Sequence, residues 1–450
     1  MGFKITDYPA KTVFNDAYLY DCSTNATTSE KVTYSQLKTD LNSNLSFLSS
    51  VPSGVCGISN ASGEYTYYST LQDAIDAASA GDTVELFSDI TETTDISVTL
   101  VAGVKINGNG HTYTLDFASA TDALVASTAS GNYYISNLNI NRVNATSGSG
   151  LSINANGISV YGKNCYVTAD GSGAAIDCAA STTYIENFTG RNTGTGEAIR
   201  AGTTSSKVYN CIGFSVSEVA IGDIFGYGII VNCIAETDSG FAAIFCREAY
   251  NSYGKGNTGR GIGCEGNIDS CVGYSNTNEG IYGGQNCNIY NSKGESNSNA
   301  GIRGSRDIYG CTAISNSGYG MAIYIVTGKI SNCTIVSTAN YALYVSSNST
   351  WTGGAYISNC HIESKLDTSS GTAIYFTSSN TATTIEPEVV NNYIKTKNAG
   401  AYGMFYSPGT VATRNINYAN NSFAGMTVAI EAAISQGIVN TADSQGNILT

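Results

Sequence analysis

The sequence contains little proline, tryptophan, histidine or charge. Among its 450 residues are 4 prolines, 1 tryptophan and 2 histidines, and 12% of the residues are charged. Two histidines and no Cys-x-x-Cys pair give no spacing of the kind that binds zinc. We therefore expect no metal site and no cofactor.

Basic runs and long apolar runs are also missing. The net charge is −14, so we expect no nucleic-acid partner. No apolar segment is long enough to span a bilayer, and the first residues, MGFKITDYPAKTV, lack the apolar core of a signal peptide. We therefore expect neither membrane insertion nor classical export.

What the sequence does contain is a short phrase that recurs between residues 207 and 338. It reads VYNCIGF, IVNCIAE, AYNSYGK, IDSCVGY, IYNSKGE, IYGCTAI and ISNCTIV in turn. Its central residues are Asn210, Asn232, Asn251, Ser270, Asn291, Gly310 and Asn332, with spacings of 22, 19, 19, 21, 19 and 22. Asn137, Asn164, Asn187, Asn359 and Asn392 extend the series in both directions. A period of about twenty residues that tolerates insertions predicts a solenoid.

Each repeat predicts two corners and at least two short strands. The asparagine lies at a bend, and the stacked amides are expected to bond one another. The following residues alternate with period two, as in Cys211 and Gly213, which predicts a strand with small side chains inside.

A second corner is expected further along each repeat. Its members are Asp238, Asn257, Asn276, Asn297 and Asn316, followed two residues later by Gly240, Gly259, Asn278, Asn299 and Gly318. The latter residue types favour a left-handed backbone. A strand with a buried aliphatic residue then follows, at Ile176, Ile199, Ile221, Ile244, Ile262, Ile281, Ile302 and Ile323.

The cysteines follow the same period. Of 13, seven take the inward position of the phrase: Cys165, Cys211, Cys233, Cys271, Cys311, Cys333 and Cys360. Cys178, Cys246 and Cys264 come two residues after a buried isoleucine. We interpret them as reduced core thiols, which implies folding in a reducing compartment.

This pattern resembles the right-handed parallel β-helix proteins of the pectin-lyase-like class, including phage tail spikes, over about residues 65–425. The predicted fold class is all-β, a single-stranded right-handed parallel β-helix, with the hand taken from the resemblance and from the rule for parallel crossovers. We expect an attachment module at 1–50, a linker and cap at 51–100, the β-helix at 101–425 and a C-terminal cap at 426–450. The cap should contain a helix at about 69–80, N-capped by Ser69, that covers the open end of the solenoid.

The first fifty residues depart from the repeat. The phrases Ile5-Thr6-Asp7-Tyr8-Pro9-Ala10, Asn15-Asp16 and Lys31-Val32-Thr33, with a leucine-bearing helix at 35–48, resemble the N-terminal module of phage tail spikes and fibres. The resemblance implies docking on other virion tail proteins, a homotrimer, and location in the virion tail after folding in the host cytoplasm. An unrelated small subdomain is the alternative.

Outward residues near the buried isoleucines suggest a binding face. Asp177, Arg200, Arg247, Tyr282, Arg303 and Tyr324 form a charged and aromatic stripe, which suits a glycan chain. The alternative is that Asp177 with Arg200, and Arg247 with Glu265, are ordinary surface ion pairs.

The family motifs of polygalacturonases and pectate lyases are missing from the sequence. Glycoside hydrolysis needs two carboxyl groups within about 5 to 9.5 Å. Glu248 and Glu265, on adjacent coils, are the one catalytic pair that we nominate.

A further outward face, beside the cysteines, carries apolar residues over several coils: Ile212, Phe214, Ile234, Tyr253, Val272, Tyr274, Ile314 and Val336. Such a face predicts contact with identical chains. Three hypotheses remain: a receptor-binding spike that recognises a host cell-surface polysaccharide, the same spike with depolymerase activity, and a β-helix enzyme or adhesin unrelated to virions. The sequence favours the first, a non-enzymatic protein.

Overall fold

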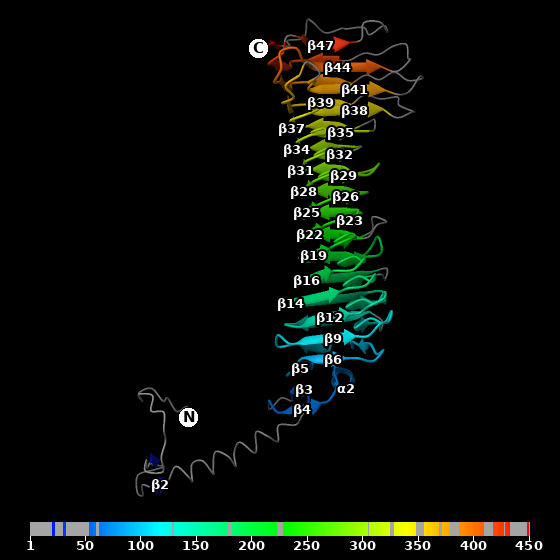
Figure 1. Cartoon of the computed structure of the whole chain (residues 1–450), viewed down its shortest axis with the longest axis vertical. Helices are drawn as coiled ribbons and strands as arrows, with labels where there is room; N and C mark the ends of the chain where they lie inside the picture. The colour runs from blue at the N-terminus through cyan, green and yellow to red at the C-terminus, as the bar shows by residue number, and fades with distance from the viewer. Residues whose placement is uncertain are drawn as a thin grey trace.

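The chain folds into a right-handed parallel β-helix, which confirms the predicted fold class. In this computed structural model the coils stack in chain order from the blue to the red end of the rod (Figure 1). The structure describes residues 54–59, 63–127, 130–178, 182–222, 228–304, 306–324, 328–347, 355–368, 371–378, 387–408, 417–426 and 428–432, with short strands at 20–22, 30–32 and 448–449.

A coil consists of three strands, and each strand pairs in parallel with its equivalents in the coils before and after it. We name the three resulting columns A, B and C. Column A contains β5 (Thr83–Leu86), β8 (Lys105–Asn107), β11 (Gly131–Ser136), the first halves of β14 (Ile158–Ala169) and β16 (Thr183–Asn192), β18 (Lys207–Tyr209), β21 (Ile229–Val231), β24 (Glu248–Tyr250), β27 (Asn267–Asp269), β30 (Asn288–Tyr290), β33 (Ile308–Tyr309), β36 (Lys329–Ser331), β39 (Tyr356–Ser358), β42 (Glu388–Val390) and β45 (Asn417–Ala419).

Column B follows column A in each coil. It contains β6 (Ile90–Glu92), β9 (Thr112–Asp116), β12 (Asn139–Val143), the second halves of β14 and β16, β19 (Ile212–Ser215), β22 (Ile234–Thr237), β25 (Tyr253–Gly256), β28 (Val272–Ser275), β31 (Lys293–Ser296), β34 (Thr312–Ser315), β37 (Thr334–Ser337), β40 (His361–Ser364), β43 (Tyr393–Thr396), β46 (Ser422–Ala424) and β48 (Ile448–Leu449).

Column C is a separate sheet of 15 strands. It contains β7 (Val98–Thr99), β10 (Leu124–Ala126), β13 (Leu151–Ile153), β15 (Ile176–Cys178), β17 (Ile199–Ala201), β20 (Ile221–Gly222), β23 (Ala242–Cys246), β26 (Arg260–Cys264), β29 (Ile281–Gly283), β32 (Ile302–Gly304), β35 (Met321–Ile323), β38 (Leu343–Ser347), β41 (Ile374–Ser378), β44 (Tyr402–Pro408) and β47 (Val428–Ala432). The first corner joins A to B, the second joins B to C, and the third joins C to the next A.

The first corner is the predicted asparagine corner. Asn210 and Asn232 have φ angles of 51° and 54°, in the left-handed region, and the Asn232 side-chain amide donates to Asn210 Oδ1 at 3.2 Å. The prediction fails at Asn392, where Asn391 takes the corner with φ 57°. Asn392 is instead buried in the cysteine position, because its Oδ1 accepts the Cys360 N–H at 2.8 Å, as a cysteine sulfur does elsewhere.

The second corner is present, but its predicted left-handed backbone is wrong. None of Gly240, Gly259, Asn278, Asn299 and Gly318 has a positive φ. A buried serine makes the bend instead, since Ser275 Oγ accepts the Asn278 N–H at 2.9 Å and donates to the Gly259 carbonyl at 2.6 Å. The amides nearby form a second ladder, with Asn276 donating to Asn257 at 2.6 Å and Asn297 to Asn276 at 2.8 Å.

The interior consists of stacked aliphatic residues and thiols. The predicted isoleucines of column C are buried and lie opposite one another from coil to coil, as Ile244 does with Ile262. Ile323 is buried but two places out of line, because Met321 pairs with Ile302. The 12 cysteines whose side chains are described are free and buried, which confirms the core-thiol interpretation. Burial raises the pKa of the Cys271 thiol to about 12.

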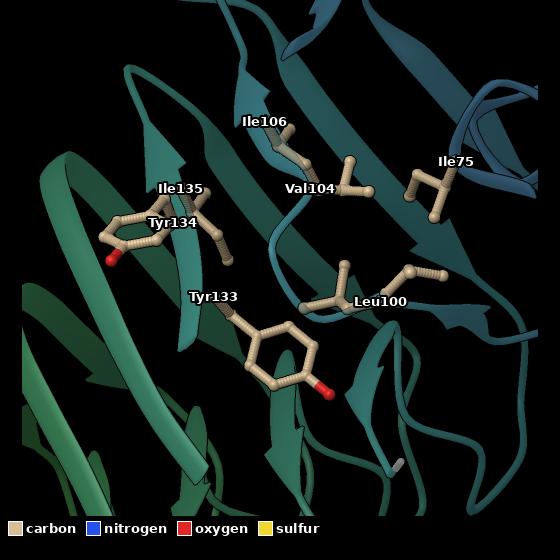
Figure 2. Close-up of a pocket in the computed structure, with 8 residues that line it drawn as sticks. Ile75, Leu100, Val104, Ile106, Tyr133, Tyr134 and Ile135 are labelled. Carbon is tan, nitrogen blue, oxygen red and sulfur yellow. The ribbon is translucent and has the colours of Figure 1, made fainter. Parts of the chain in front are cut away.

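A helix and a hairpin cover the first coil. The helix α2 runs over Leu71–Ala77, shorter than expected, and its N-cap is Thr70 rather than Ser69, since Thr70 Oγ1 accepts the Asp73 N–H at 3.1 Å. Figure 2 shows Ile75 of this helix facing Leu100 and Val104 of the first coil. The helix therefore covers apolar core that the end of a solenoid would expose.

The hairpin protects the open strand edge. It consists of β3 (Cys56–Ser59) and β4 (Tyr65–Tyr68), and β3 pairs antiparallel with β5 of the first coil. Because β5, β6 and β7 pair in parallel with β8, β9 and β10, coil geometry already begins within the segment expected to be linker and cap.

In the first fifty residues the structure describes the antiparallel pair β1 (Tyr20–Cys22) and β2 (Glu30–Val32). The expected helix at 35–48, most of the attachment module and nearly all of the expected C-terminal cap lie outside the described residues. Of the residues that are described, none belongs to a helix with the length and apolarity to cross a bilayer, nor to a group of three side chains that would bind a metal ion.

Candidate functional site

A buried carboxylate organises the most elaborate side-chain cluster on column C. Glu279, just before β29, is 1% exposed, and its two oxygens accept from Arg260 Nε at 3.1 Å and from Arg303 NH1 at 3.0 Å. The three residues come from successive coils, so the bridge ties the coils together. Two guanidinium groups share one carboxylate, which leaves one excess positive charge.

Aromatic rings enclose these guanidinium groups. The Arg260 guanidinium lies 3.9 Å from the centre of the Tyr282 ring and 4.4 Å from that of Phe241. The Arg303 guanidinium lies 4.2 Å from the centre of the Tyr324 ring and 5.4 Å from that of Tyr282. Cation–π contacts of this kind hold the arginines in fixed positions. We call Phe241, Arg260, Glu279, Tyr282, Arg303 and Tyr324 the arginine cluster.

Stacked rings continue the arginine cluster toward the C-terminus. Tyr344 lies 5.9 Å from Tyr324, and Tyr319 and Tyr344 stack at 4.5 Å with planes 12° apart. Further along, Tyr341 and Tyr375 stack at 4.2 Å and Tyr375 approaches Phe405 at 5.4 Å. We call Tyr319, Tyr341, Tyr344, Tyr375 and Phe405 the ring stack.

The ring stack offers edges to solvent. Its rings stack on one another's faces, and the four tyrosines are half-buried. We therefore expect the exposed part of each tyrosine to be its ring edge and hydroxyl, repeated at about the 4.8 Å spacing of the coils. Burial raises the pKa of Tyr319 and Tyr341, which therefore stay neutral and both donate and accept hydrogen bonds.

The structure brings together only part of the predicted stripe. Tyr282, Arg303 and Tyr324 lie in the arginine cluster, although Tyr324 follows the end of β35 instead of projecting from it. Asp177 and Arg200 form a two-point ion pair at 2.8 and 2.6 Å on an earlier part of column C.

Arg247 lies elsewhere, at the third corner. Its Nε is 3.3 Å from Glu248 Oε1, so it is paired with its neighbour in sequence and not with Glu265 as the ion-pair alternative supposed. The reason is local, since the chain turns into β24 directly after Arg247 and places Glu248 beside it.

The nominated catalytic pair stays a prediction. Glu248 accepts a hydrogen bond from the Tyr250 hydroxyl at 2.8 Å in addition to its contact with Arg247. Glu265 is exposed just after β26, beside Gly284 of the next coil. The two carboxylates are thus held in different surroundings on neighbouring coils.

Sequence reasoning missed Arg260, Glu279, Tyr319 and Tyr341. All four precede the aligned aliphatic residue of column C by two positions, with Ile262, Ile281, Met321 and Leu343 as the references. A search of that offset would have found them. The predicted stripe includes only residues that follow the aliphatic residue, and it takes Ile323 and not Met321 as the reference of its coil.

The apolar face of column B is present as predicted. Ile212, Ile234, Tyr253 and Val272 lie opposite one another in successive coils, and Ile234 and Val272 are exposed. Ion pairs alternate with them, between Lys255 and Glu236 at 3.6 Å and between Lys293 and Glu295 at 2.7 Å.

Comparisons with known proteins give little beyond this. No family model and no curated protein matches the chain. Among solved structures, the A-module of mannuronan C-5 epimerase AlgE6 from Azotobacter vinelandii aligns over 84% of this chain and 94% of that one, with 16% identity and a TM-score of 0.31. The catalytic unit of a GH87 alpha-1,3-glucanase from Streptomyces thermodiastaticus aligns over 84% and 64%, with 13% identity and a TM-score of 0.23. Likeness at this level carries no argument about the site.

Proposed function

We propose that the chain is the glycan-binding rod of a phage tail spike, a receptor-binding protein that recognises a host cell-surface polysaccharide through column C. The observation that supports this most strongly is the arginine cluster and the adjoining ring stack. Together they place charged and phenolic groups in one line along the rod axis.

The arginine cluster is suited to a polar ligand because it is already in place. Arg303 is 36% exposed, while Glu279 and Tyr324 hold its guanidinium group on the protein side. A side chain held in this way loses little conformational freedom on binding. Its remaining N–H groups are of the kind that recognise carboxylates and hydroxyls.

The ring stack suggests a ligand with a repeating structure. Phenol edges recur at about the 4.8 Å spacing of the coils, and a polymer presents repeated hydroxyl groups to them. Since the ring faces are occupied by neighbouring rings, we expect hydrogen bonding at the edges and not stacking of sugars on the rings.

The virion role is proposed from the sequence. It rests on the resemblance of residues 1–50 to tail-spike attachment modules, which would dock the chain on other tail proteins. Contact between identical chains is proposed from the exposed apolar face of column B, and their number, three, from the resemblance to tail spikes. Light scattering on the purified protein should give three times the chain mass, and a stable monomer would contradict this assembly.

Binding to purified surface polysaccharide of the host tests the proposed function. Arg303→Gln should weaken binding at least about tenfold, because a charge-assisted contact contributes about 1.4 kcal/mol or more. Lys329→Gln is the matched control, since Lys329 is exposed on column A away from the cluster. Equal binding by the wild type and Arg303→Gln would contradict the proposal that column C binds the polysaccharide.

The same incubation distinguishes a depolymerase from a binding protein. Release of reducing ends would assign depolymerase activity, as hydrolase or lyase, and Glu248→Gln and Glu265→Gln would then each be expected to abolish it. Binding without release supports the receptor-binding function.

A further inference from the structure

A hollow of about 460 Å³ lies at the third corner, apart from the arginine cluster. Lys207 of β18 and Arg247 line it, together with Tyr184 of β16 and Ile229 of β21. The exposed residues Thr182, Thr204 and Ser205, which carry hydroxyl groups, also line it. The hollow therefore combines two cations, neutral hydrogen-bonding groups and a small apolar surface.

Lys207 brings an uncompensated charge to this hollow. It is exposed, its strand neighbours are Tyr184 and Ile229, and it takes part in none of the ion pairs found among the described residues. A lysine without a carboxylate partner beside a hollow is a natural contact for an anion.

Arg247 is only loosely held by its carboxylate. Its Nε lies 3.3 Å from Glu248 but makes no hydrogen bond, and 40% of its side chain is exposed. Among the described residues, two carboxylates near these side chains have other partners, since Glu248 accepts from Tyr250 at 2.8 Å and Glu186 accepts from Tyr184 at 2.8 Å and from Asn210 at 3.0 Å. Glu248 balances the charge of Arg247, and the charge of Lys207 therefore remains as the excess among these side chains.

The hollow and the arginine cluster lie on consecutive coils. Arg247 directly follows β23, and Arg260 opens β26, the strand that pairs with β23. Both places have an excess positive charge on a chain whose net charge is −14. Arg260 aligns with Ala242 at the start of β23, whereas Arg247 follows the end of that strand, so a ligand that contacts both would cross the width of column C.

We propose that this hollow binds an acidic group of the glycan, the carboxylate of a uronic-acid-type sugar, with Lys207 and Arg247 as its counter-ions. The proposal rests on the proposed function and narrows its ligand to an anionic polysaccharide. The hydroxyls of Thr182, Thr204 and Ser205 would contact the neutral hydroxyls of the same sugar.

The test uses polygalacturonate and its fully methyl-esterified form, which share the sugar ring and differ in charge. Calorimetry at low salt should show binding of the acid by the wild type and binding at least about tenfold weaker of the ester. Lys207→Gln/Arg247→Gln should weaken binding of the acid by at least about tenfold, because two charged contacts are removed.

Lys105→Gln/Lys329→Gln is the matched control, since it removes two exposed lysines of column A elsewhere on the rod and should bind as the wild type does. Circular dichroism checks the fold, and Lys207→Gln alone serves if the double variant does not fold. No binding of the acid, equal binding of acid and ester, or unchanged binding by the double variant would overturn the proposal.

Host polysaccharide separates this failure from that of the proposed function. If Arg303→Gln loses host binding while Lys207→Gln/Arg247→Gln retains it, the receptor function stands and the hollow is not its anion site. If the wild type does not bind the host polysaccharide at all, the receptor function fails independently of the polygalacturonate result.

Discussion

The first and third corners of the rod both turn the chain from one column to the next, but they do so in different ways. At the first corner a single residue turns the chain, with Asn210, Asn232 and Asn251 at φ angles of 51°, 54° and 48°. At the third corner the length and sequence change from coil to coil, with five residues between β17 and β18 and one between β23 and β24. Backbone strain thus restricts the first corner to a few residue types, whereas the third corner is free to carry Lys207 and Arg247.

The comparison shows where a solenoid can acquire a binding site. A left-handed residue other than glycine or asparagine costs about 1 to 2 kcal/mol, and the cost recurs in every coil. The third corner has a left-handed backbone only in some coils, where glycine supplies it at Gly103, Gly157 and Gly228, and the requirement does not recur at one position in every coil. Side chains there vary from coil to coil, so we expect binding sites to arise at that corner and on the adjoining column C.

We expect the largest difference between the two corners when a β-branched residue is placed at each. Asn232→Val should lower the free energy of unfolding by about 3 kcal/mol, from the strained left-handed backbone and the lost amide hydrogen bond. Ser205→Val at the third corner should change it by less than about 0.5 kcal/mol, because Ser205 is exposed and has no positive φ. Urea denaturation measures both, and equal effects would show that the corners do not differ.

Asn232→Gly is the control for that experiment. Glycine keeps the left-handed angle at little steric cost, so its effect should be clearly smaller than that of valine and should isolate the contribution of the amide ladder.

At the second corner we expect a loss of stability between those at the first and third corners. Ser275→Ala should cost about 2 kcal/mol, because it leaves the partly buried Asn278 N–H and the Gly259 carbonyl without their shared partner. The matched variant Ser239→Ala removes an exposed hydroxyl that donates to Val216, and should cost less than about 0.5 kcal/mol. Similar denaturation midpoints for the two variants would mean that the buried hydroxyl does not hold the bend.

The smallest effect that we expect is a pH dependence of the free energy of unfolding. It arises from Cys271, an inward residue that follows the first corner. The pKa of Cys271 is raised to about 12 by burial, from an ordinary value of 9.0. The folded state keeps the proton that the unfolded chain releases, so the stabilising contribution is complete below pH 9 and is lost as the pH rises toward 12. Between pH 9 and 10 the loss should be about 1 kcal/mol for this thiol.

Cys271→Ser isolates that contribution. Serine already stands at the equivalent place in the neighbouring coils, at Ser252 and Ser292, where each Oγ accepts a backbone N–H from the preceding coil. The difference in urea midpoint between wild type and variant should therefore shrink between pH 9 and 10. A constant difference would contradict the burial of this thiol.

The sequence was most informative where the backbone demands a particular residue. The asparagine corner, the inward cysteines and the isoleucines of column C could all be predicted, because strain or core volume admits few alternatives. Prediction failed where several residues serve one purpose. Asn392 replaces a cysteine because either side chain accepts the N–H of the previous coil, and a serine hydroxyl at Ser275 makes a left-handed residue unnecessary.

The candidate site was only partly predictable. Tyr282 and Arg303 project from strands and follow the period, so they were found. Glu279 was not, because burial of a carboxylate between two arginines depends on which side chains meet across three coils. The hollow at the third corner depends on loop geometry, which no repeat fixes.

Parallel register has one further consequence. Because equivalent residues lie opposite one another in successive coils, inserting or deleting a whole coil would shift everything beyond it along the rod by about 4.8 Å while leaving each face aligned. Adding a coil would therefore lengthen each column by one strand and leave the other coils unchanged. The length of the rod and the residues on its faces can therefore change independently.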